Sequence, residues 1–291
     1  MIAHQAEHFA VADLCQTLGV SRSGYYAWRD RVVKVDELSA PVRQVFWRHS
    51  RRYGSRRIVA ELQAQDYRIG RRRVRRIMKE QQLQALQPKS FVPRTTDSRH
   101  GQRMSPNLLP ELEVSRPRQV LVSDITYLPL ASGAWAYLAT WLDLYSRKIL
   151  GWQVAATQTA ELVIGALRQA IVRERLPRGL IVHSDRGGQY VDAEFRQLLR
   201  DYGYRQSMSR AGESYDNAFA ESLFSRYKAE LLEGGAFRDL AEAELESCDY
   251  IEAYYNRVRR HSALGYLSPA EFERAYFQRT KGDHLTDQER T

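Results

Sequence analysis

The chain has 291 residues, of which 43% are hydrophobic, and a formal net charge of +9. These values indicate a folded protein with room for one sizeable α/β core and one or two small modules. No apolar run approaches ~20 residues, the start is too polar for a secretory signal, and the only cysteines are Cys15 and Cys248. The sequence therefore predicts no membrane span, no disulfide framework and no cysteine-based zinc site, and it fits a reducing cytoplasm.

Residues 1–40 predict a small N-terminal helical segment. In VADLCQTLGVSRSGYYAWRDR, a short apolar-periodic helix is followed by a Leu-Gly-Val turn and by Ser21, which opens a second helix. Two short helices around a glycine turn fit a helix-turn-helix motif, but the same pattern occurs in many other proteins. The aromatic residues Tyr25, Tyr26 and Trp28 are compatible with the core of this segment or with a stacking surface.

Residues 41–83 predict a basic helix-turn-helix segment, with helices at 56–65 and 71–82. The block 51–79 holds 11 basic and 2 acidic residues and so carries the whole net charge of the chain. Charge concentrated in this way favours nucleic acid as a partner. A solvated helix face is the alternative, but it needs interspersed acids that this block mostly lacks. The arginines are expected to contact the DNA backbone more than the bases; they are Arg56, Arg57, Arg71, Arg72, Arg73, Arg75 and Arg76.

Residues 84–118 are rich in Pro, Ser, Thr and Arg and predict a linker. Residues 119–279 predict a catalytic domain that starts with three successive strands in VLVSDITYL, AWAYLATWLDLY and RKILGWQVA. A helix at 159–173, the strand GLIVHS, a helix at 193–201, a short strand at 204–208 and a long helix follow. We therefore expect an α/β fold with a mixed five-stranded sheet flanked by helices. Further on, we expect a helix at 240–257, a short helix in HSALGYLSPAEFE and a frayed polar tail at 280–291.

Three carboxylates stand out in this domain. Asp124 lies in the first strand, Asp185 follows the strand GLIVHS, and Glu221 lies about one turn inside the long helix. Thirty-five residues separate Asp185 from Glu221. Such a trio is the usual way to hold two hard divalent cations for phosphodiester chemistry. Three carboxylates in one cleft repel each other until a cation neutralises them, so the cluster is hard to explain as structure alone.

Each acid also has a purely structural interpretation. Asp124 could form a turn at a strand end, Asp185 an Asx turn before its glycines, and Glu221 could be a solvated helix residue. Lys228 shares a helical stripe with Glu221 and is a candidate contact for a DNA end, with a chance surface lysine as the alternative. His183 lies two residues before Asp185, and we expect it to support the site or pack in the core rather than bind metal.

Two further supporting residues precede the long helix. Asp216 or Asn217 is expected to cap the helix that carries Glu221, because short polar side chains satisfy the first amide groups of a helix.

Several motifs together match a known family. They are SDITYL, LDLYSRKILGW, IVHSDRGGQY, SMSRAGESYDNAFAESLFSRYKAEL and YNRVRRHSALGYLSPAEF, with RRYGSRRI upstream. The chain resembles the OrfB transposases of the insertion-sequence-three (IS-three) family, whose catalytic core is similar to retroviral integrases and to ribonuclease H. The resemblance spans about residues 50–275. It implies that Asp124, Asp185 and Glu221 form a DDE triad, and that Lys228 lies where the family often has a Lys or Arg that binds the transposon end.

The resemblance implies a transposase of a bacterial insertion sequence that performs metal-dependent 3′-end cleavage and strand transfer. Two Mg²⁺ ions are expected, with Mn²⁺ able to substitute. The implied partners are double-stranded DNA (the terminal inverted repeats and the target), further copies of the chain on paired ends, and an OrfA companion or fusion. The implied location is the bacterial cytoplasm, at the nucleoid when bound to DNA. Two alternatives remain open: a structure-specific nuclease on the same fold, and a DNA-binding regulator with an inactive catalytic domain.

Overall fold

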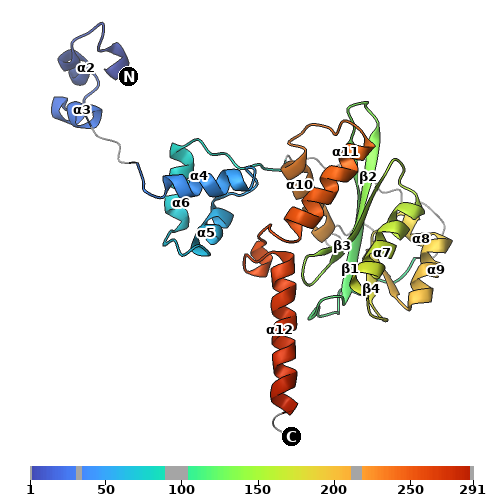
Figure 1. Cartoon of the computed structure of the whole chain (residues 1–291). Helices are drawn as coiled ribbons and strands as arrows, with labels where there is room; N and C mark the ends of the chain where they lie inside the picture. The colour runs from blue at the N-terminus through green and yellow to red at the C-terminus, as the bar shows by residue number, and fades with distance from the viewer. Residues whose placement is uncertain (1, 31–34, 89–103, 211–217, 289–291) are drawn as a thin grey trace.

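The computed structural model describes residues 2–30, 35–88, 104–210 and 218–288. Along the chain these residues form an N-terminal helical segment, a second helical unit and a domain built around a β-sheet (Figure 1). Within these ranges, no helix is both long enough and apolar enough to cross a membrane.

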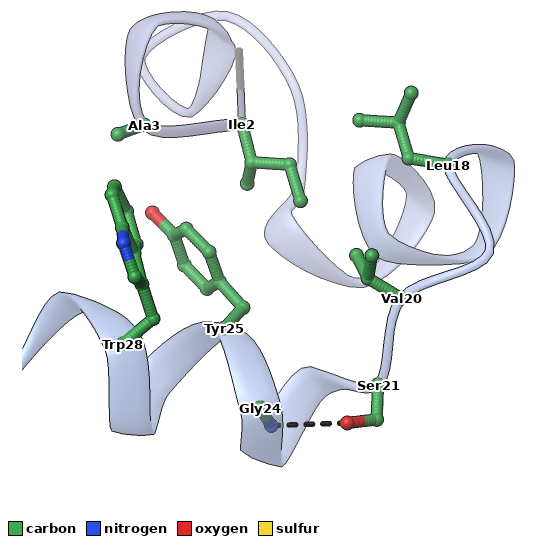
Figure 2. A pocket seen from close by; sticks show the side chains of 8 residues that line it. All are labelled: Ile2, Ala3, Leu18, Val20, Ser21, Gly24, Tyr25 and Trp28. Carbon is green, nitrogen blue, oxygen red and sulfur yellow. Dashed lines mark hydrogen bonds between the residues drawn. The ribbon is translucent and has the colours of Figure 1, made fainter.

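The N-terminal segment contains α1 (Ile2–Gln5), α2 (Val11–Thr17) and α3 (Arg22–Arg29). Ser21 caps α3 by accepting a hydrogen bond of 3.0 Å from the Gly24 amide, which confirms the predicted helix start. Tyr25 is buried, whereas Trp28 is 63% exposed. Figure 2 shows both rings on α3 beside Ile2 of α1, lining an open apolar hollow. Tyr25 therefore belongs to the core of this segment, and Trp28 remains available at its surface.

The second helical unit, residues 35–88, is called the basic module below. It contains α4 (Ser39–Arg48), α5 (Ser55–Gln63) and α6 (Arg71–Glu80), so both predicted helices are confirmed and α4 adds a third. Apolar side chains recur every three to four residues on each helix and meet in one core. That core consists of Val42, Val45, Phe46, Tyr53, Ile58, Leu62, Ile69, Val74, Ile77 and Met78.

The sheet has five strands in the order β3-β2-β1-β4-β5. They are β1 (Val120–Pro129), β2 (Trp135–Asp143), β3 (Ile149–Ala155), β4 (Ile181–Ser184) and β5 (Arg205–Met208). The pairs β1–β2 and β2–β3 are antiparallel and joined by short turns, whereas β1–β4 and β4–β5 are parallel and need helical crossovers. The mixed five-stranded sheet flanked by helices is thus confirmed.

Helices cover both faces of the sheet (Figure 1). One face carries α7 (Ala160–Glu174), α8 (Gly188–Val191) and α9 (Ala193–Tyr202), and the other carries α10 (Ala218–Leu231) and α11 (Leu240–Cys248). Because successive strand residues point to opposite faces, Val122 packs with the α10 side chains and Leu121 with those of α7. The even-numbered residues at this end of β1 therefore face α10.

Part of the predicted linker packs against the sheet domain. Residues 104–118, called the strap, contribute Leu108, Leu109 and Leu112 to the core beside α10. The Leu108 amide also donates a hydrogen bond of 2.9 Å to Ser207 Oγ in β5. Residues 89–103 lie outside the described residues.

The C-terminal region departs from the prediction in two places. The expected helix at 240–257 is split into α11 and a π-helix, η2 (Asp249–Tyr255). After a single 3₁₀ turn, η3 (Ser262–Leu264), helix α12 runs from Pro269 to Gln288. The prediction of a short helix followed by a frayed tail is therefore wrong up to Gln288. Residues 272–288 contain no proline and one glycine, and polar residues by themselves do not end a helix.

Candidate active site

The parallel pairing of β1 with β4 places Asp124 beside Asp185. The last registered pair joins Val122 to His183. Asp124 and Asp185 each lie two residues further along their chains, and side chains two residues apart share a face of a strand. Both carboxylates are therefore on the face that α10 covers. Two of the three predicted acids meet because of sheet register.

The surroundings of Asp124 disfavour its ionised form. Its side chain is half-buried, and Oδ1 accepts a hydrogen bond of 2.8 Å from the Ile125 amide. Burial raises the pKa of Asp124, the negative charge of Asp185 raises it further, and Glu221 adds a smaller contribution, so that the pKa reaches about 8. The charges of all three predicted acids therefore act at one place.

The loop after β4 fixes the direction of Asp185. The Gly187 amide donates a hydrogen bond of 3.0 Å to Asp185 Oδ1, and Ser184 Oγ donates one of 2.9 Å to the Asp185 carbonyl. Arg186 Nε donates to the Ser209 carbonyl at 2.8 Å and ties the loop to the end of β5. Asp185 therefore forms an Asx turn before its glycines, which was its structural interpretation. The same turn orients the carboxylate beside Asp124.

Gly187→Ala is expected to lower the DNA cleavage that the resemblance implies by about tenfold or more, because small displacements of reacting groups cost rate steeply. A Cβ at Gly187 would lie 2.8 Å from Gln189 Oε1, the end of a flexible side chain, and 3.1 Å from Asp185 Oδ1, so the Asp185 carboxylate must move by a few tenths of an ångström. Gly188→Ala is the matched control, since a Cβ there meets no atom within 4 Å. Rates on one labelled duplex measure the difference, and equal rates would show that the turn does not hold Asp185.

Helix α10 brings two further charged groups to the same face. Glu221 is exposed, and Lys228 is half-buried two turns later on the same side of the helix. Burial lowers the pKa of Lys228, and the charge of Asp124 opposes that shift. Lys228 therefore lies close enough to Asp124 to interact with it, an interaction that the sequence did not predict. Asp216 and Asn217, the predicted helix caps, lie outside the described residues.

His183 is buried beneath the Asp185 loop. Its Nδ1 lies 2.8 Å from Ser207 Oγ, and its Nε2 lies 3.2 Å from Ser209 Oγ. Both ring nitrogens thus contact β5 and the residue that follows it. This position agrees with a supporting role, in which His183 joins the ends of β4 and β5.

Sequence reasoning missed Tyr190. Its hydroxyl lies 2.9 Å from Ser123 Oγ in the buried sheet, next to both aspartates. Burial raises the pKa of Tyr190 well above its usual value, and the charges of Asp185 and Asp124 raise it further. Tyr190 therefore joins α8 to β1 directly behind the two carboxylates. The only signal in the sequence was its place at the end of IVHSDRGGQY, which does not reveal that the side chain turns inward.

The donor set fits a hard divalent cation. All three predicted ligands offer carboxylate oxygens, and burial together with the charges of Asp185 and Glu221 disfavours the ionised form of Asp124, a cost that a bound cation would offset. Among the residues that the structure describes, no group of three or more His, Cys, Asp or Glu side chains has the spacing of a ready-made metal site.

Asp124→Asn is expected to stabilise the metal-free protein increasingly as pH rises. The pKa of Asp124 is raised to about 8, so its contribution to stability is complete below pH 4 and is lost as pH rises through 8. The Asn variant lacks this loss. Thermal unfolding in EDTA should give a melting temperature at least about 2 °C above wild type at pH 8.5, with a smaller difference at pH 5. A difference that does not change with pH would contradict the crowding of charge at Asp124.

The seven arginines that the sequence predicts to contact DNA divide into two groups. Arg73 and Arg76 bind the Asp36 carboxylate, at 2.8 and 2.6 Å, and Arg57 pairs with Glu230 of α10. The others are exposed and have no hydrogen-bond or ion-pair partner within the described part of the chain; they are Arg56, Arg71, Arg72 and Arg75. Of the seven, the arginines of this second group are therefore the ones whose guanidinium groups are exposed and not already paired with an acid of the protein.

Residues 114–214 and 202–269 match two families that are both described as "Integrase core domain", and residues 34–91 match a family described as "HTH-like domain". "Transposase InsF for insertion sequence IS3A" of Escherichia coli (strain K12) is 40% identical over 280 residues, which cover 93% of this chain and 96% of the relative. "Insertion element IS600 uncharacterized 31 kDa protein" of Shigella sonnei is 40% identical, covering 91% and 99%. The chain therefore belongs to the IS3 family of integrase-like transposases.

Two solved structures are similar in part. A simian T-cell lymphotropic virus intasome in complex with PP2A regulatory subunit B56 gamma has a TM-score of 0.44 and 12% identity, covering 80% of this chain and 74% of that chain. The HTLV-2 integrase catalytic core domain in complex with magnesium has a TM-score of 0.40 and 17% identity, covering 54% and 97%.

Proposed function

We propose that this chain is the transposase of a bacterial insertion sequence, which cleaves DNA at the 3′ ends of the element and joins those ends to a target. The observation that carries the proposal is the β1–β4 register. Because of it, Asp124 and Asp185 lie side by side on the face of the sheet that α10 covers, and the charge of Glu221 on α10 acts on Asp124. Support also comes from relatives that are named transposases and are 40% identical over 93% of the chain.

Asp124, Asp185 and Glu221 are assigned as the ligands of two Mg²⁺ ions, for which Mn²⁺ can substitute. When bound, such ions activate the attacking oxygen and neutralise charge on the leaving oxygen. The chain itself orients the carboxylates. Strand β1 fixes Asp124 and the Gly187 turn fixes Asp185. Lys228 lies close enough to Asp124 to interact with it and is assigned a phosphate of the bound DNA end.

The basic module is assigned to DNA. Arg71 and Arg75 lie one turn apart on α6, and Arg72 follows Arg71 in sequence. The three side chains form a basic ridge that can follow a line of phosphates. The proposed ligands of the whole protein are the terminal inverted repeats and a target duplex, bound by several copies of the chain on paired ends. An OrfA companion or fusion, and a place at the nucleoid in the bacterial cytoplasm, complete the proposal.

A strand-transfer assay tests the proposal against its two rivals. A duplex carrying one end of the element, labelled on the strand to be cut, is incubated with the full chain and Mg²⁺. Cleavage followed by joining to a second duplex supports a transposase. Cleavage without joining would identify a nuclease on the same fold, and binding without cleavage would identify a regulator; either result would contradict the proposal.

A further inference from the structure

Helix α10 presents a second face, opposite Glu221, to other parts of the chain. Glu230 lies nine residues after Glu221, which at 3.6 residues per turn places it on the opposite side of the helix. The side chain of Glu230 is only 2% exposed. A carboxylate that is buried so deeply is costly unless cationic groups and hydrogen bonds surround it. The partners of Glu230 therefore show what this face of α10 holds.

Those partners come from two parts of the chain. Arg259, 3% exposed, donates from Nη2 to Glu230 Oε1 at 2.6 Å and from Nε to Oε2 at 2.7 Å, and the Tyr250 hydroxyl donates to Oε2 at 2.8 Å. Arg57 of the basic module approaches Oε1 to 3.5 Å and is 20% exposed. Burial raises the pKa of Glu230, but Arg259 and then Arg57 outweigh it, so the pKa lies below its usual value. The carboxylate is thus ionised and shared between two arginines.

A second arginine of the basic module reaches the same place. Arg52 Nε donates to the Glu230 carbonyl at 3.1 Å. Its guanidinium carbon lies 4.5 Å from the centre of the Tyr254 ring and 5.3 Å from that of Tyr250. Both rings belong to the π-helix η2, and π-turns within helices often occur at functional sites. The irregular helix thus supplies an aromatic surface on which the module rests.

Neighbouring contacts extend the interface to the C-terminal part of the chain. Tyr53 is buried, accepts a hydrogen bond of 2.8 Å from the Arg260 amide and donates one of 3.3 Å to the Val258 carbonyl. His49 stacks on Tyr53, with ring centres 3.7 Å apart. The module is therefore held by buried polar and aromatic contacts, and the carboxylate of Glu230 is the point where both sides meet.

We propose that Glu230 is a positioning residue: together with Arg57 it holds the basic module against the rear of α10, so that DNA bound by the module enters the candidate active site at one fixed place. The proposal rests on the function proposed above. One helix then carries both the assigned ligand Glu221 and the anchor of the DNA-binding module, which links the site of binding to the site of cleavage through a single rigid element.

A distance measurement tests the anchor without reference to catalysis. Spin labels are placed on Cys248, which is exposed in α11, and on an Ala64→Cys variant at the end of α5, with the buried Cys15 replaced by alanine. Arg57→Gln should broaden the distribution of distances between the labels. Arg51→Gln is the matched control, because Arg51 pairs with Glu233 at the same interface but both side chains are exposed, at 40% and 48%. The control should keep the narrow wild-type distribution.

A cleavage assay with the full-length variants then tests the positioning. The substrate is a labelled duplex that carries one end of the element, with Mg²⁺. Arg57→Gln should cut this duplex at several neighbouring positions, and the yield of product cut at the wild-type position should fall about 100-fold. Its affinity for the duplex should stay within about threefold of wild type, because Arg57 faces α10 rather than DNA. Arg57→Lys keeps the charge and should restore a single cut position.

The outcomes separate the two proposals. A wild-type chain that neither cuts nor joins overturns the proposed function, and the label distances still decide whether Arg57 anchors the module. A narrow distribution in Arg57→Gln, equal broadening in Arg51→Gln, or a single cut position in Arg57→Gln would overturn the assignment of Glu230. A loss of affinity in Arg57→Gln with an unchanged distance would make Arg57 a DNA contact instead.

Discussion

Glu221→Gln is expected to abolish both cleavage and joining of DNA, by about 10³-fold or more, because a lost cation ligand removes several kcal/mol of charge stabilisation from the transition state. Glutamine has the same size and keeps the helix propensity of the residue it replaces. Glu221 is exposed, so its replacement leaves no buried group without a partner. Binding of the element end should therefore be retained while the chemistry is lost. Gel-shift and strand-transfer assays on one duplex measure the two effects separately.

Glu244→Gln is the matched control for this experiment. Glu244 is also an exposed helical glutamate, but it lies on α11 and outside the candidate active site. We expect wild-type cleavage from this variant. Residual cleavage by Glu221→Gln close to that of its control would show that Glu221 is not a ligand, and the assignment of the triad would then be wrong.

Replacing Arg71, Arg72 and Arg75 together by alanine should give the largest loss of DNA binding. The three side chains are exposed on α6 and make no ion pair within the described residues. Log affinity falls linearly with log salt concentration, and each lost phosphate contact should reduce the steepness of this fall by about 0.9. The steepness should therefore be about 2.7 smaller in the triple variant than in the wild type. Affinities at several salt concentrations, on element-end and unrelated duplexes, give this slope.

The control removes the same charge from another surface. Arg168, Arg173 and Arg200 lie on α7 and α9 of the sheet domain, and their replacement by alanine also lowers the net charge by three. This variant should keep the wild-type slope. An equal change in both triple variants would mean that overall charge, and not the ridge on α6, governs binding.

The regular elements could be predicted because their hydrophobic periods are clear. Strands β1 to β3 alternate or run apolar, and their boundaries agree with the prediction to within a few residues. The trio of acids was identified by residue type and by resemblance. Its assembly could not be derived from the pattern, because the register between β1 and β4 joins segments about 60 residues apart. Pattern reasoning describes one strand at a time and does not fix such a pairing.

The arginines show the same limit more sharply. All seven belong to one basic block, and local sequence does not distinguish Arg57 from Arg56. Their different surroundings depend on Glu230, which lies 173 residues further along the chain from Arg57. Composition therefore predicted that the block binds a polyanion, but it could not predict that part of the block pairs with acids of the protein itself. The length of α12 could not be predicted for a different reason, because a polar composition by itself does not distinguish a solvated helix from a frayed tail.

The two outer strands of the sheet bear on how copies of this chain can associate. Asn256 accepts from the Ile149 amide and donates to its carbonyl, both at 2.9 Å, and thus pairs with the first residue of β3 as a neighbouring strand would. On the opposite side, the Met208 amide of β5 donates to the Pro106 carbonyl of the strap at 3.4 Å. Unpaired strand edges are the usual templates for joining sheets between chains. With the start of β3 and the end of β5 engaged in this way, we expect copies that meet on paired DNA ends to associate through helical surfaces and not by continuing the sheet.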